Sequence, residues 1–145
     1  MGETIATIVD TYALMAEATG EITEEARGVL DDVRRKRVLG VIHPLITYEF
    51  LTQYYRNRLP AFDSPREALE FLNTYFRTEN LTNDIATVAA DIKVKGLTLV
   101  SKMSRHLSSC DALTIALAKT GGYRILSGDQ DLRIIAGKEG VVVIW

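Results

Sequence analysis

Short runs of apolar, mostly β-branched residues alternate along this chain with segments of helical periodicity. Runs with the length and composition of buried strands lie at 5–9, 38–42, 123–126 and 141–144. Segments with helical spacing of apolar residues lie at 24–37, 44–58, 82–95 and 110–119. Strands that alternate with helices build a parallel sheet covered by helices on both faces. The sequence therefore predicts the α/β class, as a three-layer α/β/α sandwich around a central, mostly parallel sheet.

Local signals add further elements. The segment 64–67 reads Ser-Pro-Arg-Glu, a capping box with proline at the first helical position, and predicts a helix that extends to about Thr78. A short strand is expected near 79–81. Asp131 is interpreted as the cap of a short turn that follows the strand at 123–126.

Composition sets limits on size, partners and compartment. The 145 residues, 47% of them hydrophobic, predict one domain over 1–145 with a single core. The formal charge of -2 argues against a protein that coats nucleic acid through bulk charge, so a nucleic-acid role requires a local site. One cysteine allows no internal disulfide, and no signal sequence or membrane span is evident. We expect a cytoplasmic protein without membrane contact.

Four carboxylates are candidate site residues, and three of them stand at the strand ends where parallel α/β proteins collect ligands. Asp10 and Asp129 follow strands, Glu49 lies in the helix that begins after the second strand, and Asp111 begins a short apolar helix. Three of them also have an ordinary structural explanation: Asp10 as a helix cap, Asp111 with Ser108 as a capping pattern, and Asp129 as a turn residue. Glu49, inside an apolar and aromatic helix, has no capping role, and its structural alternative is a position at the surface edge of that helix.

Carboxylates that converge on one pocket repel each other and shift their own pKa values unless cations neutralise them. A site with oxygen ligands alone suits Mg²⁺ or Mn²⁺. The sequence has no Cys/His ligand pattern that would indicate zinc, and His43 and His106 are isolated. The predicted cofactor is therefore Mg²⁺ or Mn²⁺.

The four acids occur in four segments, at 8–14, 47–51, 110–118 and 125–132. In this order and spacing the segments resemble those of PIN-domain ribonucleases, and most closely the small VapC-like toxins of toxin-antitoxin pairs. The resemblance implies a parallel sheet with the first strand at its centre. It also implies a divalent-metal-dependent ribonuclease, in which activated water attacks an RNA phosphodiester.

The resemblance also assigns roles to individual residues. Asp10 and Asp111 are expected as direct metal ligands, Glu49 as a ligand or water-orienting base, and Asp129 as an outer or second-metal ligand. Supporting positions are Thr11, Ser127 and Asp131. The implied partners are RNA, a second copy of the chain in a homodimer, and an antitoxin protein. Two alternatives stay open: an RNA-processing nuclease outside a toxin pair, and a non-catalytic, metal-stabilised binding module.

RNA binding requires cations besides the metal. The densest basic run, 34–37, ends a predicted helix, where basic side chains are favourable without any ligand. Alternative RNA contacts are Arg56, Arg58, Lys102 and Arg105. Aromatic residues crowd two helices, and those left outside the core would suit a dimer or an antitoxin helix. These aromatic residues are Tyr48, Phe50, Tyr54, Tyr55, Phe71, Tyr75 and Phe76.

Overall fold

The computed structural model describes residues 6–100 and 107–145. Within these residues, five strands form one sheet in the order β3-β2-β1-β4-β5, and every neighbouring pair is parallel. The strands are β1 (Ala6–Val9), β2 (Leu39–Ile42), β3 (Arg77–Thr78), β4 (Arg124–Leu126) and β5 (Val143–Ile144). The α/β class and the parallel sheet are confirmed, and β1 lies at the centre as the resemblance implied.

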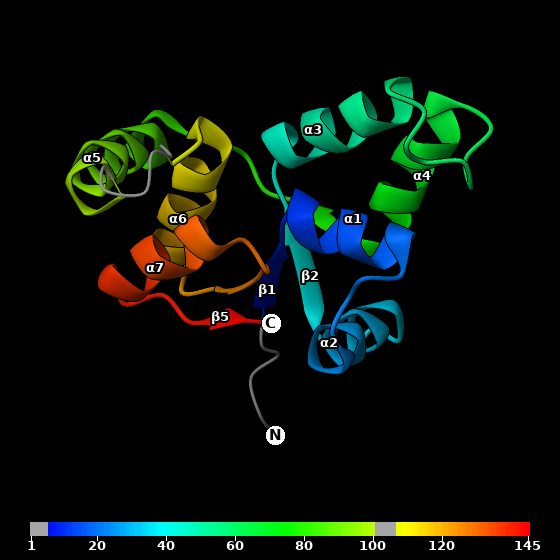
Figure 1. Cartoon of the computed structure of the whole chain (residues 1–145), viewed down its shortest axis with the longest axis horizontal. Helices are drawn as coiled ribbons and strands as arrows, with labels where there is room; N and C mark the ends of the chain where they lie inside the picture. Colours follow the sequence, from blue (N-terminus) through cyan, green and yellow to red (C-terminus); the bar gives the residue numbers. More distant parts are fainter. Residues whose placement is uncertain (1–5, 101–106) are drawn as a thin grey trace.

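Helices cover both faces of the sheet (Figure 1). The helices on one side are α1 (Thr11–Thr19), α2 (Glu24–Arg34), α3 (Pro44–Tyr55) and α4 (Pro65–Tyr75). Those on the other side are α5 (Asn83–Val100), α6 (Ser109–Gly121) and α7 (Gln130–Lys138). Helix α3 packs against α1 and α4, whereas α5, α6 and α7 pack against one another. The result is the predicted three-layer sandwich.

The centre of the sheet is the centre of the core. Ile8 of β1 is in register with Val41 of β2 on one side and with Ile125 of β4 on the other. All three side chains are fully buried. Helices on both faces exclude water from these strands, which explains why the strands are almost continuously apolar. The carboxyl ends of β1, β2 and β4 consequently meet at one edge of this rigid centre.

Several predicted boundaries were wrong, each for a local reason. The capping box is confirmed, since the Ser64 hydroxyl accepts a hydrogen bond from Glu67 N, but α4 ends at Tyr75 and not near Thr78. Phe76 is extended and nearly buried, and it leads directly into β3 at 77–78, ahead of the strand expected at 79–81. The helices predicted to reach 37 and 58 end at Arg34 and Tyr55, before left-handed residues at 36 and 57.

Helices α1 and α7 were not predicted as ranges. Helix α7 replaces the short turn expected after Asp131, and its N-cap is Asp129, whose Oδ1 accepts a hydrogen bond from Leu132 N at 2.9 Å. Helix α1 begins directly after Asp10. Both helices therefore start at the carboxyl ends of central strands. Their N-caps, Asp10 and Asp129, lie at the same edge of the sheet. Ile5, in the first predicted strand, lies outside the described residues.

Candidate active site

A cleft of about 700 Å³ opens at the carboxyl edge of the central strands. It is lined by all four predicted acids, Asp10, Glu49, Asp111 and Asp129. These acids come from the end of β1, from α3, from α6 and from the end of β4. Residues separated by nearly the whole length of the domain therefore share one solvent-accessible hollow.

Asp10 sits at the base of this cleft. It is only 4% exposed, and its Oδ1 accepts a hydrogen bond from Ala13 N at 2.9 Å, which caps α1. The buried Ser127 side chain hydrogen-bonds to the same carboxylate. The capping role considered for Asp10 is thus real, and it fixes the carboxylate at the cleft instead of excluding it from a site.

Glu49 reaches the cleft from the middle of α3. The Thr11 hydroxyl donates a hydrogen bond of 2.6 Å to Glu49 Oε1. This bond joins the first residue of α1 to a residue of α3 that is far away in the sequence. Thr11, predicted as a supporting residue, therefore orients one of the four acids through a direct contact.

Asp111, at the start of α6, and Asp129, at the end of β4, complete the acidic lining. Ser108 caps α6 through its hydroxyl, which accepts a hydrogen bond from Asp111 N at 3.0 Å. Asp129 N donates to the Ser127 hydroxyl at 3.1 Å. Ser127 thus contacts both Asp10 and Asp129 and ties two of the acids together. Asp131 is not a lining residue of the cleft.

The electrostatics of the cleft favour bound protons or cations. Burial raises the pKa of Asp10 to about 7, and the charges of Asp111 and Asp129 add to this rise. Burial also raises the pKa of Asp111 to about 7, with further contributions from Asp129, Glu49 and Asp131. Carboxyl groups with a pKa of about 7 are only partly ionised at neutral pH, and a nearby positive charge would favour their charged forms. The surroundings of Asp10 and Asp111 therefore match a cation site.

The donor set is made of carboxylate and hydroxyl oxygens, which suits a hard cation such as Mg²⁺ or Mn²⁺. Within residues 6–100 and 107–145, no three His, Cys, Asp or Glu side chains are gathered closely enough to hold an ion as they stand. The acids that line the cleft would therefore have to draw together around a cation. Cys110, next to Asp111, is buried, and burial raises the pKa of its thiol.

Among the described residues that line the cleft, Arg58 carries the positive charge. Its Nη1 donates a hydrogen bond of 3.1 Å to Oε1 of Gln53, another lining residue. Asn57, in a left-handed conformation just after α3, turns the chain at this point. Arg58 was one of four alternatives in the sequence. Of the other three, Lys102 and Arg105 lie outside the described residues.

The basic run 34–37 is a helix end and does not line the cleft. Arg34 forms ion pairs with Glu17 and Asp31, and Arg37 lies 3.8 Å from Asp32. The side chain at 36 donates a hydrogen bond to a backbone carbonyl of α4. The interpretation of this run as a helix end, and not as an RNA contact, agrees with these pairings.

His43 is buried behind the cleft. Its Nε2 lies 2.8 Å from the Thr114 hydroxyl, so the start of α3 is joined to α6, one turn beyond Asp111. Burial lowers the pKa of His43 to about 4, so the ring is neutral at physiological pH. A structural role, expected for this isolated histidine, fits its position. His106 lies outside the described residues.

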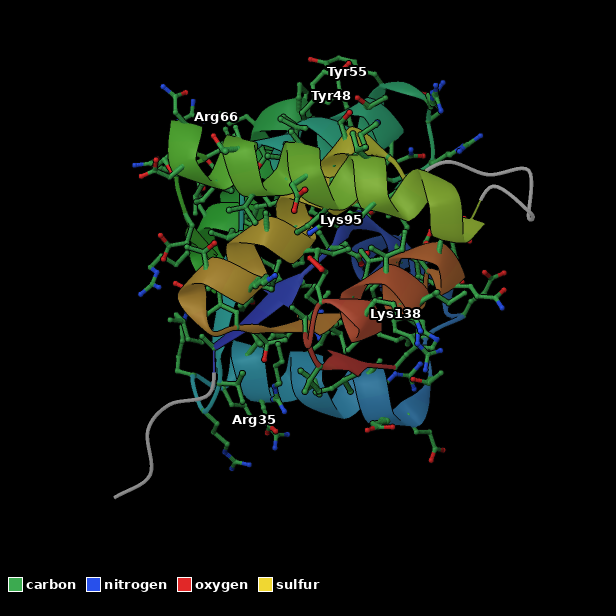
Figure 2. The ribbon with its side chains drawn as sticks, turned by 90° about the vertical axis from the view of Figure 1, so that its left-hand side faces the viewer. Arg35, Tyr48, Tyr55, Arg66, Lys95 and Lys138 are labelled. Carbon is green, nitrogen blue, oxygen red and sulfur yellow. The ribbon has the colours of Figure 1, made fainter. Side chains whose placement is uncertain are left out.

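Most of the aromatic residues on α3 and α4 belong to the core. The rings of Phe50, Phe62 and Phe71 contact one another, with centroids 5.5 to 6.1 Å apart. Tyr48 and Tyr55 are different, because each is 70% exposed. They point outward from the same end of the molecule (Figure 2). Core packing therefore explains the crowding, except for these two tyrosines.

The fold and the cleft together define a class: parallel α/β proteins whose chemistry lies in an acidic hollow at the ends of the central strands. Within that class, the chain belongs to the PIN domain family, whose family model matches residues 7–138. The resemblance inferred from the four segments is thereby confirmed, and the family is one of nucleases. The sequence matches no curated protein.

Solved structures of VapC and VapBC proteins share this fold. The VapBC2 structure from Rickettsia felis, bound to a promoter DNA fragment, aligns with a TM-score of 0.68 at 8% identity over 97% of this chain and 99% of that one. A toxin-antitoxin complex from Klebsiella pneumoniae aligns with a TM-score of 0.66 at 17% identity, covering 96% of each chain.

VapC20 from Mycobacterium tuberculosis, described as a toxin that cleaves the sarcin-ricin loop, has a TM-score of 0.58 at 20% identity over 88% of this chain and 93% of that one. Identities this low establish the shared fold and nothing finer. None of the helices in the described residues combines the length and apolar character that a membrane crossing needs.

Sequence reasoning missed three features of the cleft. Tyr12, Met15 and Thr19 line it from α1, a helix that was not predicted as a range. Their spacing of three and four residues is a helical signal, and it begins two residues after Asp10. This signal would have located both the helix and its cleft-facing side.

Proposed function

We propose that this protein is a divalent-metal-dependent ribonuclease that acts as the toxin of a toxin-antitoxin pair. One observation carries the proposal: four carboxylates line a single cleft at the ends of the central strands, and two of them have a pKa of about 7. Membership of the PIN domain family supports the nuclease class. The fold shared with VapC and VapBC structures supports the toxin assignment.

Asp10 and Asp111 are proposed as direct ligands of Mg²⁺ or Mn²⁺. When bound, such a cation polarises a phosphate and lowers the pKa of water. Asp10 is suited to this role because Ala13 N and Ser127 hold its carboxylate in place from behind. Asp129 is proposed as the outer or second-metal ligand, and its capping bond to Leu132 N leaves a second oxygen for that purpose.

Glu49 is proposed to bind the cation or to orient the attacking water. Its Oε1 accepts the hydrogen bond of the Thr11 hydroxyl, which fixes the direction of the carboxylate. Arg58 is proposed to contact a phosphate of the RNA, because it places a cation in a cleft that is otherwise acidic. In this proposal the carboxylates bind the cation and orient the water at the phosphodiester that is cut, while Arg58 binds a phosphate of the same RNA strand.

The nuclease proposal is tested by incubating the protein with a mixed pool of structured RNA and Mn²⁺ or Mg²⁺. We expect cleavage that EDTA abolishes and that Asp10→Asn reduces by about 100-fold, because a carboxylate ligand is lost. Asp84→Asn is the matched control, since Asp84 is an exposed acid in the first turn of α5 that does not line the cleft. Equal cleavage by the Asp10 variant and the wild type would contradict the proposal.

The toxin part requires a separate test. Induced expression in a bacterial host should arrest growth with the wild type and not with Asp10→Asn at equal protein levels. Growth that is unaffected by an RNA-cleaving wild-type protein would instead favour a processing nuclease. Cation binding without cleavage of any RNA would favour a non-catalytic binding module.

A homodimer and an antitoxin are the proposed protein partners. Tyr48 and Tyr55 lie at positions that share one face of α3, and their exposure leaves an aromatic surface without cover in the single chain. Sedimentation equilibrium should give twice the chain mass, and a double substitution of Tyr48 and Tyr55 by Ser should weaken that association. A monomeric wild-type protein would exclude the homodimer.

A further inference from the structure

Three strand ends stand side by side at the cleft. Val9 of β1 is in register with Leu126 of β4, and Leu126 is in register with Ile144 of β5. The residues that follow Val9, Leu126 and Ile144 therefore lie side by side in a row at the ends of the three strands. Asp10 to Tyr12 follow β1, Ser127 to Asp129 follow β4, and Trp145 follows β5. Aromatic side chains thus flank the row that carries two of the four acids.

Tyr12 and Trp145 contact each other across this row. Their ring centroids are 5.4 Å apart and their planes meet at 80°, an edge-to-face arrangement. Gly128, directly before Asp129, makes this contact possible. A Cβ atom on Gly128 would come within 2.5 Å of both rings, so any side chain there would displace them. The rings therefore lie against the backbone of the loop that presents Asp129.

This aromatic pair borders a second hollow, of about 280 Å³, next to the acidic cleft. The two hollows share Tyr12, Met15 and Thr19, so one runs into the other. Tyr12 is 48% exposed, whereas Trp145 is partly buried. A polymer that crosses the acidic cleft toward α1 therefore meets an aromatic surface immediately beyond it.

We propose that Tyr12 and Trp145 form a stacking site for one unpaired nucleobase of the RNA, next to the phosphate that is cut. This inference rests on the proposed ribonuclease function and names the substrate feature that the cleft would recognise: a single-stranded nucleotide. Every nucleobase offers a flat π-face, and aromatic side chains are the usual surface on which proteins stack unpaired bases.

The charge distribution favours a base over a phosphate in the second hollow. Glu21 lines it, and no Lys or Arg does so among the described residues. An uncharged ring is accepted in such surroundings, whereas a phosphate is repelled. Arg58 instead lines the acidic cleft, where the backbone of the RNA would pass. The second hollow therefore suits the nucleobase, and the neighbouring acidic cleft suits the RNA backbone.

The chain contains one tryptophan, so its fluorescence reports on Trp145 alone. A short single-stranded RNA is titrated in Ca²⁺, a hard cation that oxygen ligands also bind, and the RNA is checked afterwards on a gel for integrity. We expect saturable quenching by the intact oligomer and little quenching by oligomers of equal length that carry abasic sites. Equal quenching by the intact and abasic oligomers would overturn the stacking site.

Variants separate stacking from folding. Tyr12→Leu should raise the Kd of the intact oligomer about tenfold and leave the Kd of the abasic oligomer unchanged, because only a base contact is lost. Tyr12→Phe keeps the ring and should restore binding. Gly128→Ala should mimic Tyr12→Leu, with circular dichroism used to verify the fold. Identical Kd values for wild type and Tyr12→Leu would exclude Tyr12 from the site.

Cleavage kinetics in Mg²⁺ distinguish the two proposals. Tyr12→Leu should raise KM for RNA with little change in kcat. Base-dependent quenching by a protein that cuts no RNA would retain the stacking site and remove the ribonuclease function. Cleavage that depends on Asp10, with no base-dependent quenching, would retain the ribonuclease and remove the stacking site.

Discussion

Replacing Asp10 with asparagine should stabilise the cation-free protein. The pKa of Asp10 rises from 3.8 to about 7 because the carboxylate is buried, so its charged form is penalised in the folded state. A tenfold change in an acid constant corresponds to about 1.4 kcal/mol, which gives a penalty of about 4 kcal/mol once the group is ionised. The asparagine side chain would have no charge, and its carbonyl could still accept the hydrogen bond of Ala13 N.

The sign follows from proton linkage. Between its unfolded and folded pKa values, Asp10 binds more protons in the folded state, so its contribution to stability falls as the pH rises from 3.8 to about 7. The advantage of Asp10→Asn should therefore be about 4 kcal/mol near pH 8, about 2 kcal/mol near pH 5, and close to zero below pH 3.8. These values are upper limits, because water entering the cleft reduces the penalty.

Urea unfolding in EDTA, followed by circular dichroism, measures this difference at each pH. Comparing variant and wild type at one pH cancels the titration of the groups that do not interact with Asp10. Asp84→Asn, at an exposed helix start, should change the free energy of unfolding by less than about 0.5 kcal/mol. Saturating Mn²⁺ should stabilise the wild type more than Asp10→Asn. A variant that is less stable than the wild type near pH 8 would refute the reasoning.

Other substitutions test the cleft and its support. Thr11→Val removes the hydrogen bond to Glu49 and should slow RNA cleavage about tenfold, with recovery in Thr11→Ser; unchanged kinetics would show that Glu49 needs no such support. Arg58→Gln should weaken RNA binding and reduce the slope of log Kd against log salt by about 0.7, whereas an unaltered slope would remove the phosphate contact. Burial lowers the pKa of His43 from 6.5 to about 4, so the unfolded chain takes up a proton at this residue before the folded protein does. The folded protein should therefore lose up to about 3 kcal/mol of stability as the pH drops from 6.5 to about 4. His43→Gln should flatten this acid-side loss in urea unfolding, and parallel stability curves would contradict the assignment.

The sequence was sufficient to predict the sheet and the acids, because both depend on short-range patterns. An apolar strand followed by an aspartate is visible at 6–10, and the strand at 124–126 precedes Asp129 in the same manner. Since parallel strands end at one edge, convergence of the acids followed from the class of fold. Helix caps were also predictable from local chemistry. The Ser108 and Ser64 hydroxyls cap α6 and α4 as the capping patterns in the sequence indicate.

The rest depends on neighbours that are distant in the sequence. Helices α1 and α7 have only nine residues each, and helices this short depend on packing against the core for their stability. The contact between Tyr12 and Trp145 requires β5 to lie next to β4 and β4 next to β1, an order that local periodicity does not contain. Arg58 reaches the cleft only because the chain turns at Asn57.

The central position of β1 also determines when the cleft is assembled during synthesis. One neighbour of β1 is β4, which the ribosome makes only after six helices have emerged within the described part of the chain. A nascent chain that stops before β4 has Asp10, Glu49 and Asp111 but lacks Asp129 and the strand that presents it. Pairing between such distant segments forms late, because a long loop must close first. The acidic cleft is therefore incomplete in the growing polypeptide until nearly the whole domain has left the ribosome.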